Sequence, residues 1–130
     1  MIFLSLRSDN PMAEAALYDN EHEKQTITWE AHRMLAETLH QKIETLLKEN
    51  DVKWENIEGV VLYAGPGSFT GLRIGFSVGN AIAYANKVQI VAETGDDWQM
   101  RGVTRLMGCQ GDVVALPEYG GPAHTTTQLK

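Results

Sequence analysis

The feature that most constrains this chain is an apolar segment between residues 70 and 86. Its only charge is Arg73, and small residues recur at every fourth position, at Gly71, Gly75, Gly79 and Ala83. This spacing places the small residues on one stripe of a helix. Because the helix is apolar almost all round, we expect it to be buried on more than one side. A small domain offers one sheet to cover one side, so we infer that a partner covers the other.

A strand and a glycine-rich turn precede this helix. Residues 57–63 end in an apolar run, and Gly65 and Gly67 follow, where the backbone can take conformations that other residues avoid. Ser68 or Thr70 is expected to cap the helix. The turn lacks the Gly-Lys-Ser/Thr ending of a nucleotide P-loop, so we expect a structural turn. A phosphate cradle at the helix N-terminus is the alternative.

The composition narrows the class of protein. At 130 residues the chain is expected to be one domain, residues 1–130. Eleven Lys and Arg against seventeen Asp and Glu give a net charge of −6, which argues against a free-standing nucleic-acid binder. With Cys109 as the single cysteine, no internal disulfide can form, and we expect a cytoplasmic protein. No apolar run approaches the length of a membrane span.

The order of the predicted elements defines a fold class. Residues 2–6, 13–18 and 23–29 read as three strands of an antiparallel meander, because the links between them are short. A long amphipathic helix follows, with Thr28 as a possible cap and an apolar stripe at Ala31, Met34, Leu35, Leu39, Ile43, Leu46 and Leu47. Residues 57–63, 70–86 and 88–92 then form a right-handed strand–helix–strand crossover. We predict an α/β fold with a five-stranded mixed sheet and two main helices, the ribonuclease-H-like lobe of actin-like proteins.

Residues 93–130 are predicted as a C-terminal extension whose role the sequence leaves open. Met100, Val103, Leu106 and Met107 favour a short helix despite Gly102. Residues 112–116 favour a strand, and the polar residues 124–130 are expected to fray or to dock on another surface.

A resemblance to a known family rests on residues 65–75, which read GPGSFTGLRIG. These eleven residues resemble the bacterial TsaB family, and the likeness extends over about residues 2–92. The resemblance implies a non-catalytic subunit of the actin-like (ASKHA) superfamily. Such a subunit pairs with a TsaD-type transferase in tRNA threonylcarbamoyladenosine synthesis, joined by a TsaE-type ATPase. It implies no cofactor on this chain, ATP and metal on the partner subunits, and only indirect contact with tRNA.

The resemblance also implies where the partner binds. In the family, the two long helices of this lobe form a bundle with TsaD, and the same surface can make a homodimer. Either assembly is compatible with the sequence. Together with the two-sided burial expected for the second helix, this places the partner interface on Ser68, Phe69, Thr70, Gly71, Leu72, Arg73, Gly75, Phe76, Gly79 and Ala83.

Two departures from the family pattern bear on catalysis. Family members carry a second actin-like lobe, and their first strand runs into an acidic residue where this chain has Arg7, with Asp9 two residues later. An actin-like nucleotide site uses such an acid near the metal, so independent ATP hydrolysis is not expected. The alternative is a small actin-like nucleotide-binding hydrolase or a peptidase-like enzyme. It requires an acid–base or metal cluster, which the sequence does not offer.

Overall fold

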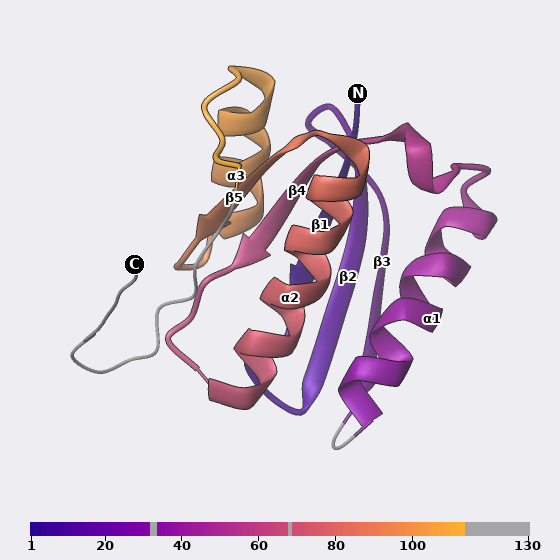
Figure 1. Cartoon of the computed structure of the whole chain (residues 1–130), viewed down its shortest axis with the longest axis vertical. Coiled ribbons are helices and arrows are strands. Elements are labelled where there is room, and N and C mark those ends of the chain that lie inside the picture. The colour runs from indigo at the N-terminus through magenta and orange to yellow at the C-terminus, as the bar shows by residue number, and fades with distance from the viewer. Residues whose placement is uncertain (32–33, 68, 114–130) are drawn as a thin grey trace.

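The computed structural model describes residues 1–31, 34–67 and 69–113, and a five-stranded mixed sheet runs through them (Figure 1). The strand order is β3-β2-β1-β4-β5, in which β1, β2 and β3 are antiparallel and β4 is parallel to both β1 and β5. This confirms the predicted meander and crossover. The strands are β1 (Ile2–Arg7), β2 (Met12–Asp19), β3 (His22–Glu30), β4 (Ile57–Tyr63) and β5 (Gln89–Glu93).

Helices cover both faces of the sheet. Helices α1 (Leu35–Glu49) and α2 (Phe69–Asn86) lie side by side on one face, and α3 (Trp98–Met107) lies on the other (Figure 1). A short 3-10 turn, η2 (Trp54–Asn56), leads into β4. Two apolar cores result, one between the sheet and α1 and α2, the other between the sheet and α3.

Strand β1 occupies the centre of the sheet because both of its faces are apolar. Leu4 and Leu6 belong to the core under α1 and α2, whereas Phe3 belongs to the core under α3. Ser5, also on β1, is buried and accepts a hydrogen bond from Gln99 Nε2 of α3 at 3.3 Å. The apolar run at residues 2–6 therefore correctly predicted a strand buried on both faces.

Helix α1 starts later than the sequence predicts. Thr28, the proposed cap, lies in β3 opposite Glu14, and β3 stays paired with β2 as far as Glu30. The helix begins at Leu35, after Met34, and no side chain caps it. The Thr28 prediction is wrong because ladder pairing with β2 holds these residues extended. The predicted apolar stripe from Leu35 to Leu47 is buried, but Met34 is exposed.

The short helix predicted near residues 100–107 is α3. Glycine is favoured at position 102, despite its low helix propensity, because a Cβ there would collide with the side chain of Val61 on β4. Beyond α3, Asp112 forms one antiparallel bridge with Ile90 of β5. The rest of the strand predicted at 112–116, from residue 114 on, and the tail at 124–130 fall outside the described residues.

Candidate functional site

The glycine stripe of α2 faces the protein's own sheet. A Cβ at Gly75 would collide with Ser8 Oγ of the β1–β2 turn, and a Cβ at Gly79 would lie 2.7 Å from Leu62 Cδ2 of β4. Ser8 Oγ also donates a hydrogen bond to the carbonyl of Gly71 at 2.8 Å. The small residues thus allow the helix backbone to approach the sheet closely. We attribute the glycine spacing to helix–sheet packing within the chain.

Five of the ten predicted interface residues, the two glycines Gly75 and Gly79 among them, are buried on this inward side. Leu72, Phe76 and Ala83 are buried in the core beneath α2. Thr70 and Arg73 are exposed, and Gly71 is intermediate. Ser68 falls outside the described residues, and Phe69 is the first residue of α2. The structure therefore divides the eight predicted residues with described side-chain burial between the domain's interior and its surface, and among these eight Thr70 and Arg73 are exposed.

A second stripe of α2 faces outward, and it was not predicted from the sequence. Its members are separated by three or four residues and are all exposed: Thr70, Arg73, Ser77, Ala81 and Tyr84. Ser77 and Ala81 each follow a stripe glycine by two residues, which rotates them by about 200° around the helix. The signal was present in the sequence as a second series of small residues. Choosing between the two series required knowing which one meets the sheet.

The outward stripe belongs to a face built from both long helices. Ile74, Val78 and Ile82 of α2 are partly buried and pack against the core that α1 shares. Thr70, Arg73, Ile74 and Ser77 line an open depression of about 270 Å³ on α2. Helix α1 adds exposed polar and charged side chains at Glu37, His40, Gln41, Thr45 and Lys48. We call this two-helix surface the α1–α2 face. Its α2 half is nearly uncharged and its α1 half is polar.

The glycine turn packs against the turn between β1 and β2. Gly65 has a φ of +94°, which favours glycine. A Cβ at Gly67 would lie 2.5 Å from Asp9 Cβ, so the two turns are in close contact. The buried carboxylate of Asp9 forms an ion pair with Arg7, whose Nε donates to Asp9 Oδ1 at 2.7 Å. This geometry supports the structural interpretation of the turn over a phosphate cradle.

Arg7 occupies the position at which the family resemblance predicts an acidic residue, and contacts with neighbouring side chains fix its guanidinium group. The hydrogen bond to Asp9 raises the pKa of Arg7 despite its partial burial. Its guanidinium carbon lies 4.0 Å from the ring centroid of Tyr63, at the end of β4. These contacts join the carboxyl ends of β1 and β4.

A polar contact joins α3 to the meander nearby. Gln99 Nε2 donates to Glu14 Oε2 at 2.9 Å as well as to Ser5. Burial raises the pKa of the Glu14 carboxyl, and the positive charge of Arg7 acts against this effect. Since Glu14 and Ser5 lie on different strands, the amide of Gln99 fixes the start of α3 over the sheet.

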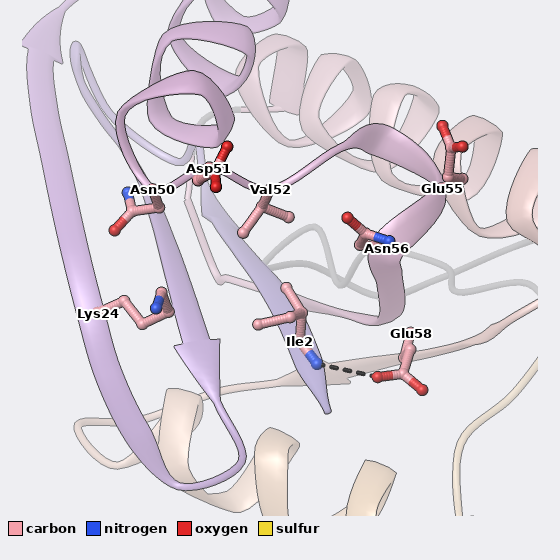
Figure 2. A pocket seen from close by; sticks show the side chains of 8 residues that line it. All are labelled: Ile2, Lys24, Asn50, Asp51, Val52, Glu55, Asn56 and Glu58. Atoms are coloured by element: carbon pink, nitrogen blue, oxygen red, sulfur yellow. Dashed lines mark hydrogen bonds between the residues drawn. The ribbon is translucent and has the colours of Figure 1, made fainter.

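A further hollow lies away from all these residues, at the end of the sheet where β1 and β4 begin. Its volume is about 580 Å³, and Figure 2 shows the eight side chains that line it: Ile2, Lys24, Asn50, Asp51, Val52, Glu55, Asn56 and Glu58. Within it, Ile2 N donates to Glu58 Oε1 at 3.2 Å. None of the predicted interface residues whose side chains the structure describes contributes to this wall.

Within residues 1–31, 34–67 and 69–113, no group of three or more His, Cys, Asp or Glu side chains is placed to hold a metal ion. None of the helices within these ranges is long and apolar enough to cross a membrane.

Comparisons with known proteins agree with the topology. Two solved structures, described as YeaZ from Pseudomonas aeruginosa and as a protein similar to peptidase YEAZ from that organism, each superpose with a TM-score of 0.67 at 25% identity. Each match covers 72% of this chain and 43% of the other, so this chain spans less than half the length of those proteins. No curated protein sequence matches the chain.

The sheet order, the two-helix layer and these superpositions define the class as an actin-like, ribonuclease-H-like α/β lobe. The sequence profile of one family, TsaD, described as tRNA N6-adenosine threonylcarbamoyltransferase, matches residues 22–94, more than half of the chain. The chain therefore belongs to this family, and the match to YeaZ places it among the TsaB proteins. This confirms the resemblance noted at residues 65–75.

Proposed function

We propose that this protein is a non-catalytic subunit that pairs with a TsaD-type transferase through its α1–α2 face and supports tRNA threonylcarbamoyladenosine modification. The observation that carries the proposal is the outward stripe of α2. An exposed helical surface that is nearly uncharged, with Ser77 and Ala81 at its centre, allows a partner helix to pack at short distance. Membership of the family supports a role in this modification system.

The division of labour follows from the chemistry on this chain. Asp9 is already paired with Arg7. We therefore assign ATP and metal to partner subunits, a TsaD-type and a TsaE-type protein, and none to this chain. The net charge of −6 supports contact with tRNA through the partner rather than directly. We place the complex in the cytoplasm.

Substitutions on the outward stripe test the proposal. Ala81→Trp should abolish co-purification with the cognate TsaD-type protein at micromolar concentration, because the indole occupies the space of the partner helix. The unfolding midpoint should stay within the small range usual for surface changes. Thr104→Trp, an exposed position on α3 and on the opposite face of the sheet, is the matched control and should bind normally. Normal binding by Ala81→Trp would refute the assigned face.

Two further measurements separate the proposal from its alternatives. Sedimentation of the chain alone, and of Ala81→Trp alone, tests whether the same face also pairs two copies. Calorimetric titration with ATP and magnesium tests the enzyme alternative. Clear saturable binding by the isolated chain would favour a nucleotide-binding hydrolase over a non-catalytic subunit.

A further inference from the structure

Strand β3 forms one edge of the sheet and has an unpaired outer side. It runs for nine residues, from His22 to Glu30, and β2 is its neighbour in the sheet (Figure 1). Within residues 1–31, 34–67 and 69–113, no other strand pairs with it. Proteins usually protect such an edge with charged residues, proline, a bulge or a short strand. The segment from Gln25 to Trp29 has no charge, proline or glycine, and its Thr-Ile-Thr-Trp run is typical of strands.

Hydrogen bonds at the end of β3 show which of its backbone groups face outward. Ala31 N donates to the carbonyl of Pro11 at 2.9 Å, so the backbone of residue 31 faces β2. In an antiparallel ladder this orientation alternates, so the odd-numbered residues of β3 nearby also face β2. Met12 N agrees with this alternation, since it lies opposite Glu30 but donates to a side-chain oxygen of the β1–β2 turn at 2.8 Å. The N–H and C=O groups of the even-numbered residues within 26–30 therefore point away from the sheet.

A bulge limits the regular part of this edge. Leu17 pairs with Gln25 and Tyr18 pairs with Glu23, which leaves Lys24 as an extra residue on β3. A bulge bends and twists its strand locally, and this protects the first residues of the edge from pairing. The regular outer row therefore covers residues 26–30.

We propose that two copies of this chain pair antiparallel along residues 26–30 of β3, about a two-fold axis at Thr28. In this register Thr28 lies opposite the partner's Thr28, and Thr26 lies opposite the partner's Glu30. Each outward N–H then meets an outward C=O of the other copy. A register moved by two residues, with its axis at Thr26, would bring the bulge at Lys24 into the pairing. This pairing is independent of the partner function proposed for the α1–α2 face.

The charges of the segment make it complementary to itself. The hydroxyl of Thr26 can donate to the carboxylate of the partner's Glu30, and a Thr–Thr pair such as the one at the axis is favourable across strands. Glu30 carries the only charge within residues 25–30. The Glu30 residues of the two copies lie at opposite ends of the paired segment, about 14 Å apart along the strands. This exceeds the Debye length of about 8 Å at physiological salt, so the two carboxylates repel each other little.

Residue-resolved hydrogen exchange of the full chain, at protein concentrations up to roughly 1 mM, tests the contact. In dilute protein the amides of Thr26 and Thr28 should exchange rapidly, whereas the amide of Ile27, which faces β2, should be protected. In concentrated protein the amides of Thr26 and Thr28 should gain protection in step with the dimer fraction measured by sedimentation.

Thr26→Lys and Thr28→Lys form a matched pair, since both positions are exposed and lie on the same face of β3. Thr26→Lys places an ammonium group opposite the partner's Glu30 twice in the dimer and should tighten association by about 2- to 30-fold. Thr28→Lys places two like charges opposite each other at the axis and should weaken association by about 2- to 5-fold. Thr28→Pro removes an outward N–H that β2 does not use and should abolish association. The two lysine variants keep the test decisive if the proline unfolds the strand.

Three outcomes would overturn the proposal. Protection of the Thr26 and Thr28 amides that does not change with protein concentration would show that no second copy pairs with β3. Weaker association in Thr26→Lys than in Thr28→Lys would exclude the axis at Thr28. Protection that appears only when the TsaD-type protein is added would show that a strand of that protein occupies the edge. Ala81→Trp, on α2, should leave β3 pairing unchanged, so failure of this proposal is distinguishable from failure of the proposed function.

Discussion

The closest approach between α2 and the sheet gives a prediction whose sign can be worked out. Gly75→Ala adds a methyl group where Ser8 Oγ now lies. Overpacking of this kind costs about 1–3 kcal/mol. Displacing the hydroxyl also breaks its 2.8 Å hydrogen bond to the carbonyl of Gly71, which contributes about 1 kcal/mol. The higher helix propensity of alanine offsets about 1 kcal/mol of these two costs. We expect a net loss of about 1–3 kcal/mol.

A second substitution should reverse part of that loss. Ser8→Ala alone removes the hydrogen bond and should cost about 1 kcal/mol. In the Gly75→Ala background it also removes the colliding oxygen, which leaves Ser8 Cβ 3.2 Å from the new methyl group. We expect the double variant to lie within about 1 kcal/mol of the unsubstituted protein. Ser8→Ala should therefore destabilise the unsubstituted protein and stabilise the Gly75→Ala variant.

Urea unfolding followed by tryptophan fluorescence measures these differences, since Trp29 and Trp98 are both buried. A loss of 1–3 kcal/mol corresponds to a midpoint shift of about 1 M urea for a small domain. Ser77→Ala, on the exposed side of the same helix, is the control and should change stability by less than about 0.5 kcal/mol. If Gly75→Ala were as stable as the unsubstituted protein, the glycine stripe would not contact the sheet as described.

Three further predictions address other parts of the fold. Thr38→Val should lower the free energy of unfolding by about 1–3 kcal/mol, because the buried Trp29 Nε1 donates to Thr38 Oγ1 at 3.0 Å and would lose its acceptor. The control is Thr45→Val, which removes only an exposed hydrogen bond to the carbonyl of Gln41 and should cost less in the same urea assay. Glu93→Gln removes the anion shared by Arg101 at 3.2 Å and Arg105 at 2.6 Å. Because both arginines are partly exposed, we expect a loss of about 1 kcal/mol in stability that becomes smaller at high salt. An equal loss at all salt concentrations would contradict an ionic origin. Burial, with the charges of Glu23 and Glu14, raises the pKa of Tyr18 from 10.0 to about 12. Because the folded state then retains a proton that the unfolded chain releases, the free energy of unfolding should fall as pH rises from 10 to about 12. Tyr18→Phe should flatten this pH dependence in urea titrations at stepped pH.

Particular elements show how far the sequence alone carried the interpretation. The run at residues 2–6, the stripe from Leu35 to Leu47 and the crossover at residues 57–92 all carry a local period, and each element exists as predicted. The start of α1 was misjudged because pairing between β2 and β3 holds Thr28 extended, and that pairing is not local. The Arg7–Asp9 pair was not predicted, although both residues were singled out.

The sequence by itself determined that α2 carries one bare stripe in an apolar helix, since side-chain spacing along a helix is fixed by its period. Only the tertiary structure decided which neighbour that stripe meets, and it is the protein's own β1–β2 turn and β4. The physical reason is that periodicity groups residues on a face but does not orient that face relative to a sheet. Orientation depends on contacts between distant segments, as between Gly75 and Ser8, and these contacts turn Ser77 and Ala81 toward the solvent.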